Sequence, residues 1–333
     1  MQQHDVVLLN CRVLAWMFLS DWLVVRLASF AMLARHWQAV ISFWSSIGRL
    51  PKLCPPESQN DKFFWRKLFD HNPLFETFCN KLASKKWVKC QCPKLLVPKT
   101  LWEGWSAADI PEHFFTQRVF VKANNGSSYN IRIDGTTCDR QSLDKLFDRW
   151  LARPYGQRQA EWGYRNVPRK VFVEQTVGSA KNEPPVLVQV FAMAGKPVCA
   201  HCMIGWKDGE RHGSFYSLSG ERLPVRDMDC EPIPVDWQVP EGFQRAIEQS
   251  KLLVRNIDHV RCDLMCVDQQ VWFSEMTPYS ASGLEKYATR EAEELVYKNW
   301  NLRQSWFLTT PQQGWRLRYA EALLRLLNDT SAD

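Results

Sequence analysis

The chain has 333 residues, a formal net charge of +6 and 45% hydrophobic residues. This composition excludes a disordered chain, and the length allows one large or two modest domains whose cores need no disulfides. The eleven cysteines are irregularly spaced and no cleavable signal sequence is evident, so we expect a cytoplasmic protein. No nucleic-acid-binding motif is present, and the basic segment 61–100 indicates a different anionic partner, such as phosphate, polysaccharide or lipid headgroups. A basic face exposed to solvent is the alternative.

The N-terminal segment, residues 6–47, is apolar and aromatic, but charged residues interrupt it, so a membrane span is not predicted. Trp16, Leu19, Leu23, Leu27 and Phe30 recur at helical spacing. This pattern predicts an amphipathic helix lying on an anionic membrane, at its inner face, or on a partner. A helix packed on the protein's own body is the alternative. The proline-rich residues 48–61 indicate a linker.

The predicted elements after this linker are α+β in character. A helix is expected over 73–86, a loop over 93–111, a strand over 118–123 with a small polar turn after it, and a helix over 142–152. Strands follow at 170–175, 186–193 and 197–204, then a helix at 241–255, strands at 258–267 and 271–277, and helices at 290–300 and 314–328. Antiparallel hairpins dominate this order, which is not a series of βαβ units.

The last predicted hairpin carries the strongest chemical signal. If its loop is residues 268–270, pairing is symmetric about Gln269, and residue 263 lies opposite 275, 265 opposite 273 and 261 opposite 277. Asp263 and Glu275 would then share a face with Cβ atoms roughly 5 Å apart. Two carboxylates this close repel unless a cation lies between them, and Mg²⁺ carrying nucleotide phosphates is the commonest case. Acids exposed to water on an edge hairpin are the alternative.

Two further segments are weaker signals. Lys122 ends an apolar strand, where its ammonium group can contact a phosphate, and the turn of residues 124–128 offers backbone N–H groups and hydroxyls. Neither a Walker A motif nor a dinucleotide-binding glycine motif is present. The strand that ends at Glu174 and Gln175 can form a hinge that contacts adenine and ribose. Taken alone, the segment fits a buried strand with an exposed end better.

The cysteine pairs do not favour a zinc site. Cys90 and Cys92 form one close pair, and Cys199 and Cys202 form the other. A structural zinc site needs four ligands, usually from two such pairs. His201 offers a further ligand, but in a strand its side chain would point to the face opposite that of Cys202.

Taken in order, these segments resemble the TupA-like ATP-grasp family, named for teichuronopeptide biosynthesis and often linked to surface polysaccharide clusters. The family's Phe-Val-x-Lys strand and its following Asn-His-x-Ser-Gly turn are similar to residues 120–128. Its Arg-x-Asp and Glu-Leu-Thr strands are matched by residues 261–263 and 275–277, and its helix motifs by Asn80-Lys81 and residues 85–88. The resemblance covers residues 61–300. Asn125 replaces the family's histidine, and Gln189 replaces a lysine.

The resemblance implies an ATP-grasp fold, in which ATP lies between two α+β subdomains with largely antiparallel sheets, preceded here by a helical segment. Residues 1–60 would be this segment and linker, 61–115 an N-terminal lobe, 116–178 the nucleotide-binding subdomain, and 179–333 the metal-binding subdomain with C-terminal helices. The implied nucleotide contacts are Lys122, Asn124, Gly126, Ser127, Ser128, Glu174 and Gln175. The implied Mg²⁺ ligands are Asp263, Glu275 and Thr277, and the catalytic residues are Arg261 and Lys122.

The implied activity is ligation of a carboxylate to an amine through an acylphosphate, with ATP and Mg²⁺ as cofactors. The substrates would be glycan-linked, in a surface polysaccharide or its precursor. A phosphotransferase or glycan-modifying transferase on the same fold is one alternative. A non-catalytic module that binds glycans or membranes is another.

Overall fold

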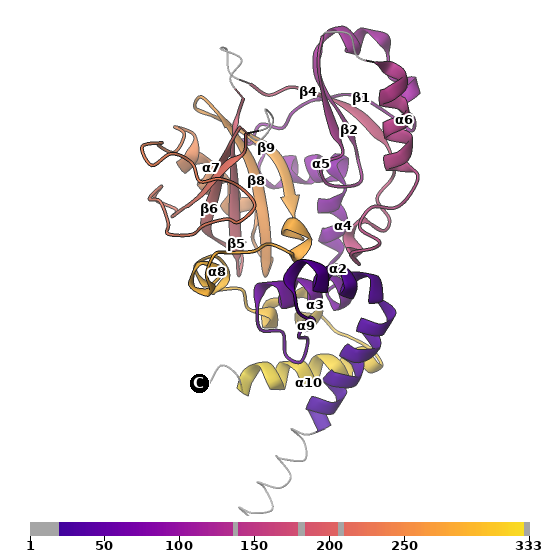
Figure 1. Cartoon of the computed structure of the whole chain (residues 1–333), viewed down its shortest axis with the longest axis vertical. Coiled ribbons are helices and arrows are strands. Elements are labelled where there is room, and N and C mark those ends of the chain that lie inside the picture. Colours follow the sequence, from indigo (N-terminus) through magenta and orange to yellow (C-terminus); the bar gives the residue numbers. More distant parts are fainter. Residues whose placement is uncertain (1–19, 136–138, 179–183, 206–209, 330–333) are drawn as a thin grey trace, which may run out of the picture. The chain divides into compact units, whose positions relative to one another are not determined.

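The computed structural model describes residues 20–135, 139–178, 184–205 and 210–329. One compact unit consists of the chain up to His71 together with the segment from Asn301, and the other of Asn72–Trp300 (Figure 1). The sequence predicted a boundary between the N-terminal segment and the rest of the chain at residue 60, from composition. The two compact units of the structure meet along the chain after residues 71 and 300.

The first unit is helical. Residues 20–35 form a helix, followed by α2 (Trp37–Ile47), α3 (Gln59–Phe69), α9 (Trp306–Thr309) and α10 (Trp315–Asp329). The helix α3 begins inside the predicted linker because Ser58 and Asp61 form a capping box there. Its aromatic side chains build the core: the Trp65 indole donates a 2.9 Å hydrogen bond to the Tyr319 hydroxyl, and Phe69 stacks on the Tyr319 ring at 4.4 Å between centroids.

The second unit contains two antiparallel sheets (Figure 1). The smaller one has the order β1-β4-β2-β3 and consists of β1 (Thr100–Gly104), β2 (Arg118–Ala123), β3 (Asn130–Asp134) and β4 (Val171–Gln175). Val119 and Val121 face the helix α6 (Arg140–Leu151), where they pack with Leu143 and Phe147. Because side chains alternate along a strand, Lys122 projects from the opposite face.

The larger sheet has the order β7-β6-β5-β8-β9. Its strands are β5 (Val186–Met193), β6 (Lys196–Ile204), β7 (His212–Tyr216), β8 (His259–Val267) and β9 (Gln270–Thr277). Apolar side chains on one face, including Val188, Cys262 and Leu264, join a core with α4 (Pro73–Cys79), α5 (Lys81–Gln91) and α7 (Phe243–Leu253). The alternate residues, among them Gln189 and Asp263, face the other way.

The α+β class with two antiparallel sheets is confirmed, and the remaining helix, α8 (Arg290–Tyr297), starts at the predicted residue. Three predictions were wrong in detail. The helix expected over 73–86 is two helices, because the Asn80 side chain accepts a hydrogen bond from the Ala83 N–H and starts α5 anew. The loop expected over 93–111 contains β1, and β3 and β7 were not predicted at all.

Candidate active site

A cavity of about 350 Å³ lies in the second unit and is lined by side chains from both sheets. Most of the residues predicted from the sequence line it: Lys122, Ser127, Ser128, Glu174, Gln175, Arg261, Asp263 and Glu275. Thr277 instead lines a smaller neighbouring cavity, which it shares with Arg261 and Glu275. Asn124 and Gly126 line neither of these two cavities.

The predicted pairing of Asp263 with Glu275 is present in the β8–β9 hairpin, and Arg261 pairs with Thr277 as expected. The rest of the register was predicted wrongly. The turn has two residues, since Val267 pairs with Gln270, and Met265 pairs with Trp272. A β-bulge at Ser274 then shifts the register by one residue and restores the pairing of the two acids.

The carboxylate of Asp263 is buried and held by two neighbours. Arg261 donates two hydrogen bonds of 2.7 Å to it, from Nε to Oδ1 and from Nη2 to Oδ2, and Gln189 donates a third of 3.2 Å to Oδ2. Burial raises the pKa of Asp263 to about 6, although the Arg261 charge acts in the opposite direction. Glu275 is half-buried beside it, and no described residue forms a hydrogen bond to its carboxylate.

This pair fits a hard divalent cation. A carboxylate offers about four acceptor positions, so Asp263 keeps one after its three hydrogen bonds, and Glu275 keeps all of its own. Oxygen ligands from one or two carboxylates, completed by water and phosphate oxygens, are the usual protein environment of Mg²⁺. The donor set therefore suits Mg²⁺ carrying a nucleotide.

Arg261 is fixed on both sides. Besides Asp263, its guanidinium donates a 2.5 Å hydrogen bond to the Ser280 hydroxyl and lies 3.7 Å from a Glu285 oxygen. Glu285 is held in turn by the Tyr287 and Tyr297 hydroxyls, at 3.1 and 2.7 Å. Burial alone would lower the pKa of Arg261, but Asp263 outweighs it and the pKa is raised, so the guanidinium stays charged.

Three lysines, Lys81, Lys85 and Lys122, also line the cavity. Glu174 forms ion pairs with both Lys85 and Lys122, and the Lys85 ammonium also donates to the Pro98 carbonyl at 3.0 Å. Burial alone would raise the pKa of Glu174, but the charges of Lys122 and Lys85 lower it overall. Lys81 donates to the Gly126 carbonyl, and burial lowers its pKa. Glu174 thus contacts lysines, where the sequence suggested adenine or ribose.

Lys81, Lys85, Gln189 and Glu285 were not among the predicted site residues. Lys81 and Lys85 are four residues apart on α5, and this spacing places them on one face of the helix. That spacing, following the Asn80 cap, was the available signal. Gln189 was noted in the sequence only as the replacement of a family lysine, and Glu285 carries no such local pattern.

In the polar turn after β2, residues 124–128, some residues stabilise the fold and others line the cavity. The Asn124 side chain donates to the Pro168 carbonyl at 2.9 Å and accepts from the Leu82 N–H at 3.0 Å, so it ties α5 to the turn. Gly126 has a φ of +102°, and a Cβ there would lie 2.8 Å from the Tyr129 and Tyr155 rings. Asn125 is buried, whereas Ser127 and Ser128 line the cavity.

The chain is distantly similar to several solved structures. The ATP-grasp ligase PsnB bound to a minimal precursor matches at 10% identity and a TM-score of 0.36, over 77% of this chain and 64% of that chain. D-alanine–D-alanine ligase from Bacillus anthracis matches at 13% identity and a TM-score of 0.39, over 76% and 69% of the two chains. The chain thus spans slightly less than two thirds of the PsnB chain. No curated protein matches it.

A sequence-family model matches residues 61–299, which is more than half of the chain, and its description is TupA-like ATP-grasp. This match confirms the family, and with it the ATP-grasp fold, that the motifs around Lys122, Asp263 and Glu275 indicated. It also confirms the prediction of an ATP-grasp enzyme at the level of the family. The chain is a member of the TupA-like ATP-grasp family.

Proposed function

We propose that this chain is an ATP- and Mg²⁺-dependent ligase that joins a carboxylate to an amine. The observation that carries the proposal is the composition of the cavity walls. Lys81, Lys85 and Lys122 line the cavity together with Asp263 and Glu275. A triphosphate needs both kinds of group, cations for its oxygens and carboxylates for its Mg²⁺.

The lysines and the acids have separate tasks in this reaction. Lys122 and Lys85 contact phosphate oxygens, and Glu174 keeps their ammonium groups in place. Asp263 and Glu275 hold Mg²⁺, which neutralises phosphate charge when it is bound. Arg261, fixed between Asp263 and Glu285, stabilises the charge of the phosphoryl group or of the tetrahedral intermediate. The protein acts mainly by positioning and charge stabilisation.

The proposed bond changes are those of an acylphosphate route. A substrate carboxylate oxygen attacks the γ-phosphorus of ATP, the bond to the bridging oxygen breaks, and ADP leaves. The amine nitrogen then attacks the acyl carbon, inorganic phosphate leaves and the nitrogen loses a proton, which gives the amide. We propose that the acceptor is a surface polysaccharide or its precursor and that the amine belongs to an amino acid or a similar compound.

Incubation with ATP, Mg²⁺, amino acids and candidate glycan carboxylates tests this function. We expect one ADP and one phosphate to be released for each new amide formed. When hydroxylamine replaces the amine, we expect a hydroxamate, because hydroxylamine traps acylphosphates. ADP together with a phosphorylated acceptor would instead identify a phosphotransferase. Nucleotide binding with no turnover over the whole acceptor set would identify a binding module.

The N-terminal helices support a further part of the proposal, association with an anionic membrane surface. Among the described residues, no helix is long and apolar enough to cross a membrane. The helix over 20–35 and α2 bury one row of side chains, including Val25, Ala39 and Phe43. A second apolar row remains exposed and follows a regular spacing of four and three residues: Leu23, Leu27, Phe30, Ala34, Trp37, Ile41 and Trp44.

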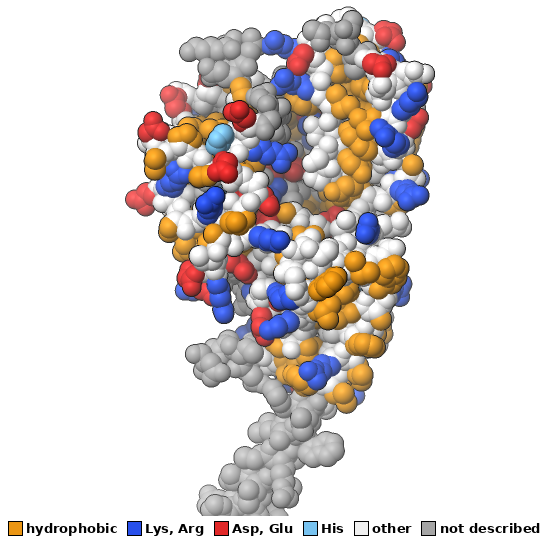
Figure 2. Space-filling view, in the orientation of Figure 1, with side chains coloured by type: hydrophobic (Ala, Val, Ile, Leu, Met, Phe, Trp, Pro, Cys, Tyr) orange, Lys and Arg blue, Asp and Glu red, His pale blue; other side chains and the backbone are white. Residues whose placement is uncertain are grey.

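We call these seven residues the apolar stripe. Hydrophobic side chains gather over α2 in Figure 2. Trp37 and Trp44 are both 58% exposed, and indole rings suit the interface between lipid and water. Arg26 and Arg35 are exposed on the same segment and can contact anionic headgroups. Trp16 and Leu19 of the predicted helix lie outside the described residues.

We expect the full-length protein to float with anionic phospholipid vesicles, less so at high salt because salt screens the headgroup charge. Replacing both Trp37 and Trp44 by Gln should reduce flotation ~10-fold or more, since each ~1.4 kcal/mol of lost interfacial free energy is tenfold in binding. Trp105→Gln, at a 67% exposed tryptophan of the other compact unit, is the control. Equal flotation of the double variant and this control would exclude the stripe.

A further inference from the structure

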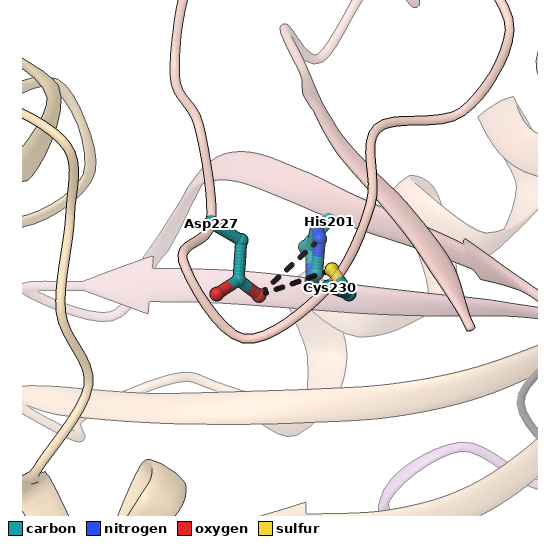
Figure 3. A group of neighbouring side chains, drawn as sticks. All are labelled: His201, Asp227 and Cys230. Atoms are coloured by element: carbon teal, nitrogen blue, oxygen red, sulfur yellow. Dashed lines mark hydrogen bonds and ion pairs between the residues drawn. The ribbon is translucent and has the colours of Figure 1, made fainter.

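Three side chains from separate segments converge at one edge of the cavity. His201 is on β6, while Asp227 and Cys230 are on the segment that follows β7, and their ligand atoms all lie within 4.8 Å of one another (Figure 3). The Asp227 Oδ2 atom is 3.8 Å from His201 Nε2 and 3.6 Å from Cys230 Sγ. From this convergence we infer a second metal site, distinct from the carboxylate pair, that binds Zn²⁺ or a similar borderline transition metal.

The hydrogen bonds around His201 direct a lone pair into this cluster. Gln189 donates its amide N–H to Asp263, so its carbonyl oxygen is the atom that faces His201 Nδ1 at 3.1 Å. A carbonyl only accepts, and Nδ1 must therefore carry the proton. The Nε2 atom is then the unprotonated nitrogen. It is buried, and no described residue forms a hydrogen bond to it. A ligating histidine usually has such a partner at its other nitrogen.

The other two groups are also held in position. The Asp229 N–H donates a 2.8 Å hydrogen bond to Asp227 Oδ1, which leaves Oδ2 toward His201 and Cys230. The Gly213 N–H donates a 2.7 Å hydrogen bond to the Glu231 carbonyl and fixes the backbone next to Cys230. A Cβ on Gly213 would lie 2.4 Å from His201 Nε2 and 2.6 Å from Cys230 Sγ. Only glycine leaves the space between these two ligand atoms open.

The donor set selects the class of metal. One imidazole nitrogen, one thiolate and one carboxylate oxygen suit Zn²⁺, whereas Mg²⁺ takes oxygen ligands. In tetrahedral zinc sites, bonds of about 2.0–2.3 Å place neighbouring ligand atoms roughly 3.3–3.7 Å apart. The two separations from Asp227 Oδ2, 3.6 Å to Cys230 Sγ and 3.8 Å to His201 Nε2, are close to these values. The third, from His201 Nε2 to Cys230 Sγ, lies within 4.8 Å and shortens when the metal binds. The Cys230 thiol loses its proton when the metal binds.

Three protein ligands leave a fourth coordination position for water or a substrate atom. His201 and Asp227 also line the large cavity, so this position lies at the cavity's edge. The bridge from His201 through Gln189 to Asp263 connects the two sites. The site would therefore bind a borderline metal next to the proposed ATP and Mg²⁺ site without sharing a ligand with it.

Cobalt substitution of the metal-stripped, full-length protein tests the inference. With excess Mg²⁺ present to fill the hard oxygen sites, Co²⁺ should bind at one equivalent and show a thiolate-to-cobalt charge-transfer band in the near ultraviolet. Zn²⁺ should remove that band stoichiometrically. Cys230→Ser should abolish the band, and Asp227→Asn should weaken Zn²⁺ binding ~10-fold or more.

Both substitutions are nearly isosteric, and thermal melts without metal verify that the variants fold. Cys90→Ser, at an exposed cysteine outside the cluster, is the matched control and should keep the band. A charge-transfer band that persists in folded Cys230→Ser would place the thiolate ligand elsewhere and overturn the inference. So would the absence of a stoichiometric Co²⁺ complex in the wild-type protein.

Discussion

Glu275→Gln is expected to abolish Mg²⁺-dependent turnover, with kcat reduced ~10²–10³-fold or more, in a protein that stays fully folded. The amide keeps the shape of the side chain but removes one of the two carboxylate charges proposed to hold Mg²⁺. No described residue forms a hydrogen bond to the Glu275 carboxylate, so the substitution removes no hydrogen bond of the fold. Steady-state kinetics at saturating ATP over a Mg²⁺ titration, together with thermal melts, measure the two effects separately.

Glu248→Gln, at an exposed residue of α7, is the matched control and should leave both quantities unchanged. Asp263→Asn is the less discriminating variant. It too should abolish turnover, but it removes the carboxylate that accepts two hydrogen bonds from the buried Arg261 guanidinium and leaves Glu285 as its acidic neighbour. Breaking a buried ion pair of this kind costs about 3–5 kcal/mol in the free energy of unfolding. Turnover near the wild-type level in folded Glu275→Gln would show that the metal assignment is wrong.

Lys122→Ala is expected to raise the KM for ATP, or to lower kcat, about 10- to 100-fold. A hydrogen bond to a charged group is worth about 1.5–3 kcal/mol, and the proposed phosphate contact is of this kind. Stability should fall less than catalysis, because Glu174 keeps its second ion pair with Lys85 after Lys122 is lost. Initial rates over an ATP titration and isothermal titration with a non-hydrolysable ATP analogue measure the effect.

Lys86→Ala provides the comparison for this prediction. Lys86 is next to the buried Lys85 on α5, but it is exposed and does not line the cavity. Removing it changes the net charge by the same amount without removing a cavity group. If Lys122→Ala and Lys86→Ala show the same ATP dependence, the phosphate contacts must lie elsewhere.

The β8–β9 hairpin shows how far sequence reasoning reached. Pairing of Asp263 with Glu275 was predicted from a symmetric three-residue loop, whereas the chain has a two-residue turn followed by a bulge at Ser274. The shorter turn shifts the pairing by one residue, and the bulge shifts it back. The predicted register therefore holds at Asp263 and Glu275 but at no pair between them and the turn. Alternation along each strand is local and readable from the sequence, but a bulge depends on the packing of both faces of the sheet.

The N-terminal helices show a different limit. Helical spacing of Leu23, Leu27 and Phe30 predicted a helix, and the structure has one over residues 20–35. The same spacing could not show that this row is the exposed one. Val25 and Phe43, in another row, pack in the core of the first compact unit. Both rows are apolar, so only the tertiary contacts distinguish the packed face from the free one.

The sequence by itself determined the family, the two strands that carry the acid pair, and the position of Lys122, because each depends on residue types at short spacing. The tertiary structure alone decided that Glu174 joins Lys122 to Lys85, and that His201 meets Asp227 and Cys230. Glu174 lies 52 residues from Lys122, and the segment of Asp227 is brought to His201 by pairing along β7. Contacts of this kind form when distant segments pack, and no local periodicity encodes them.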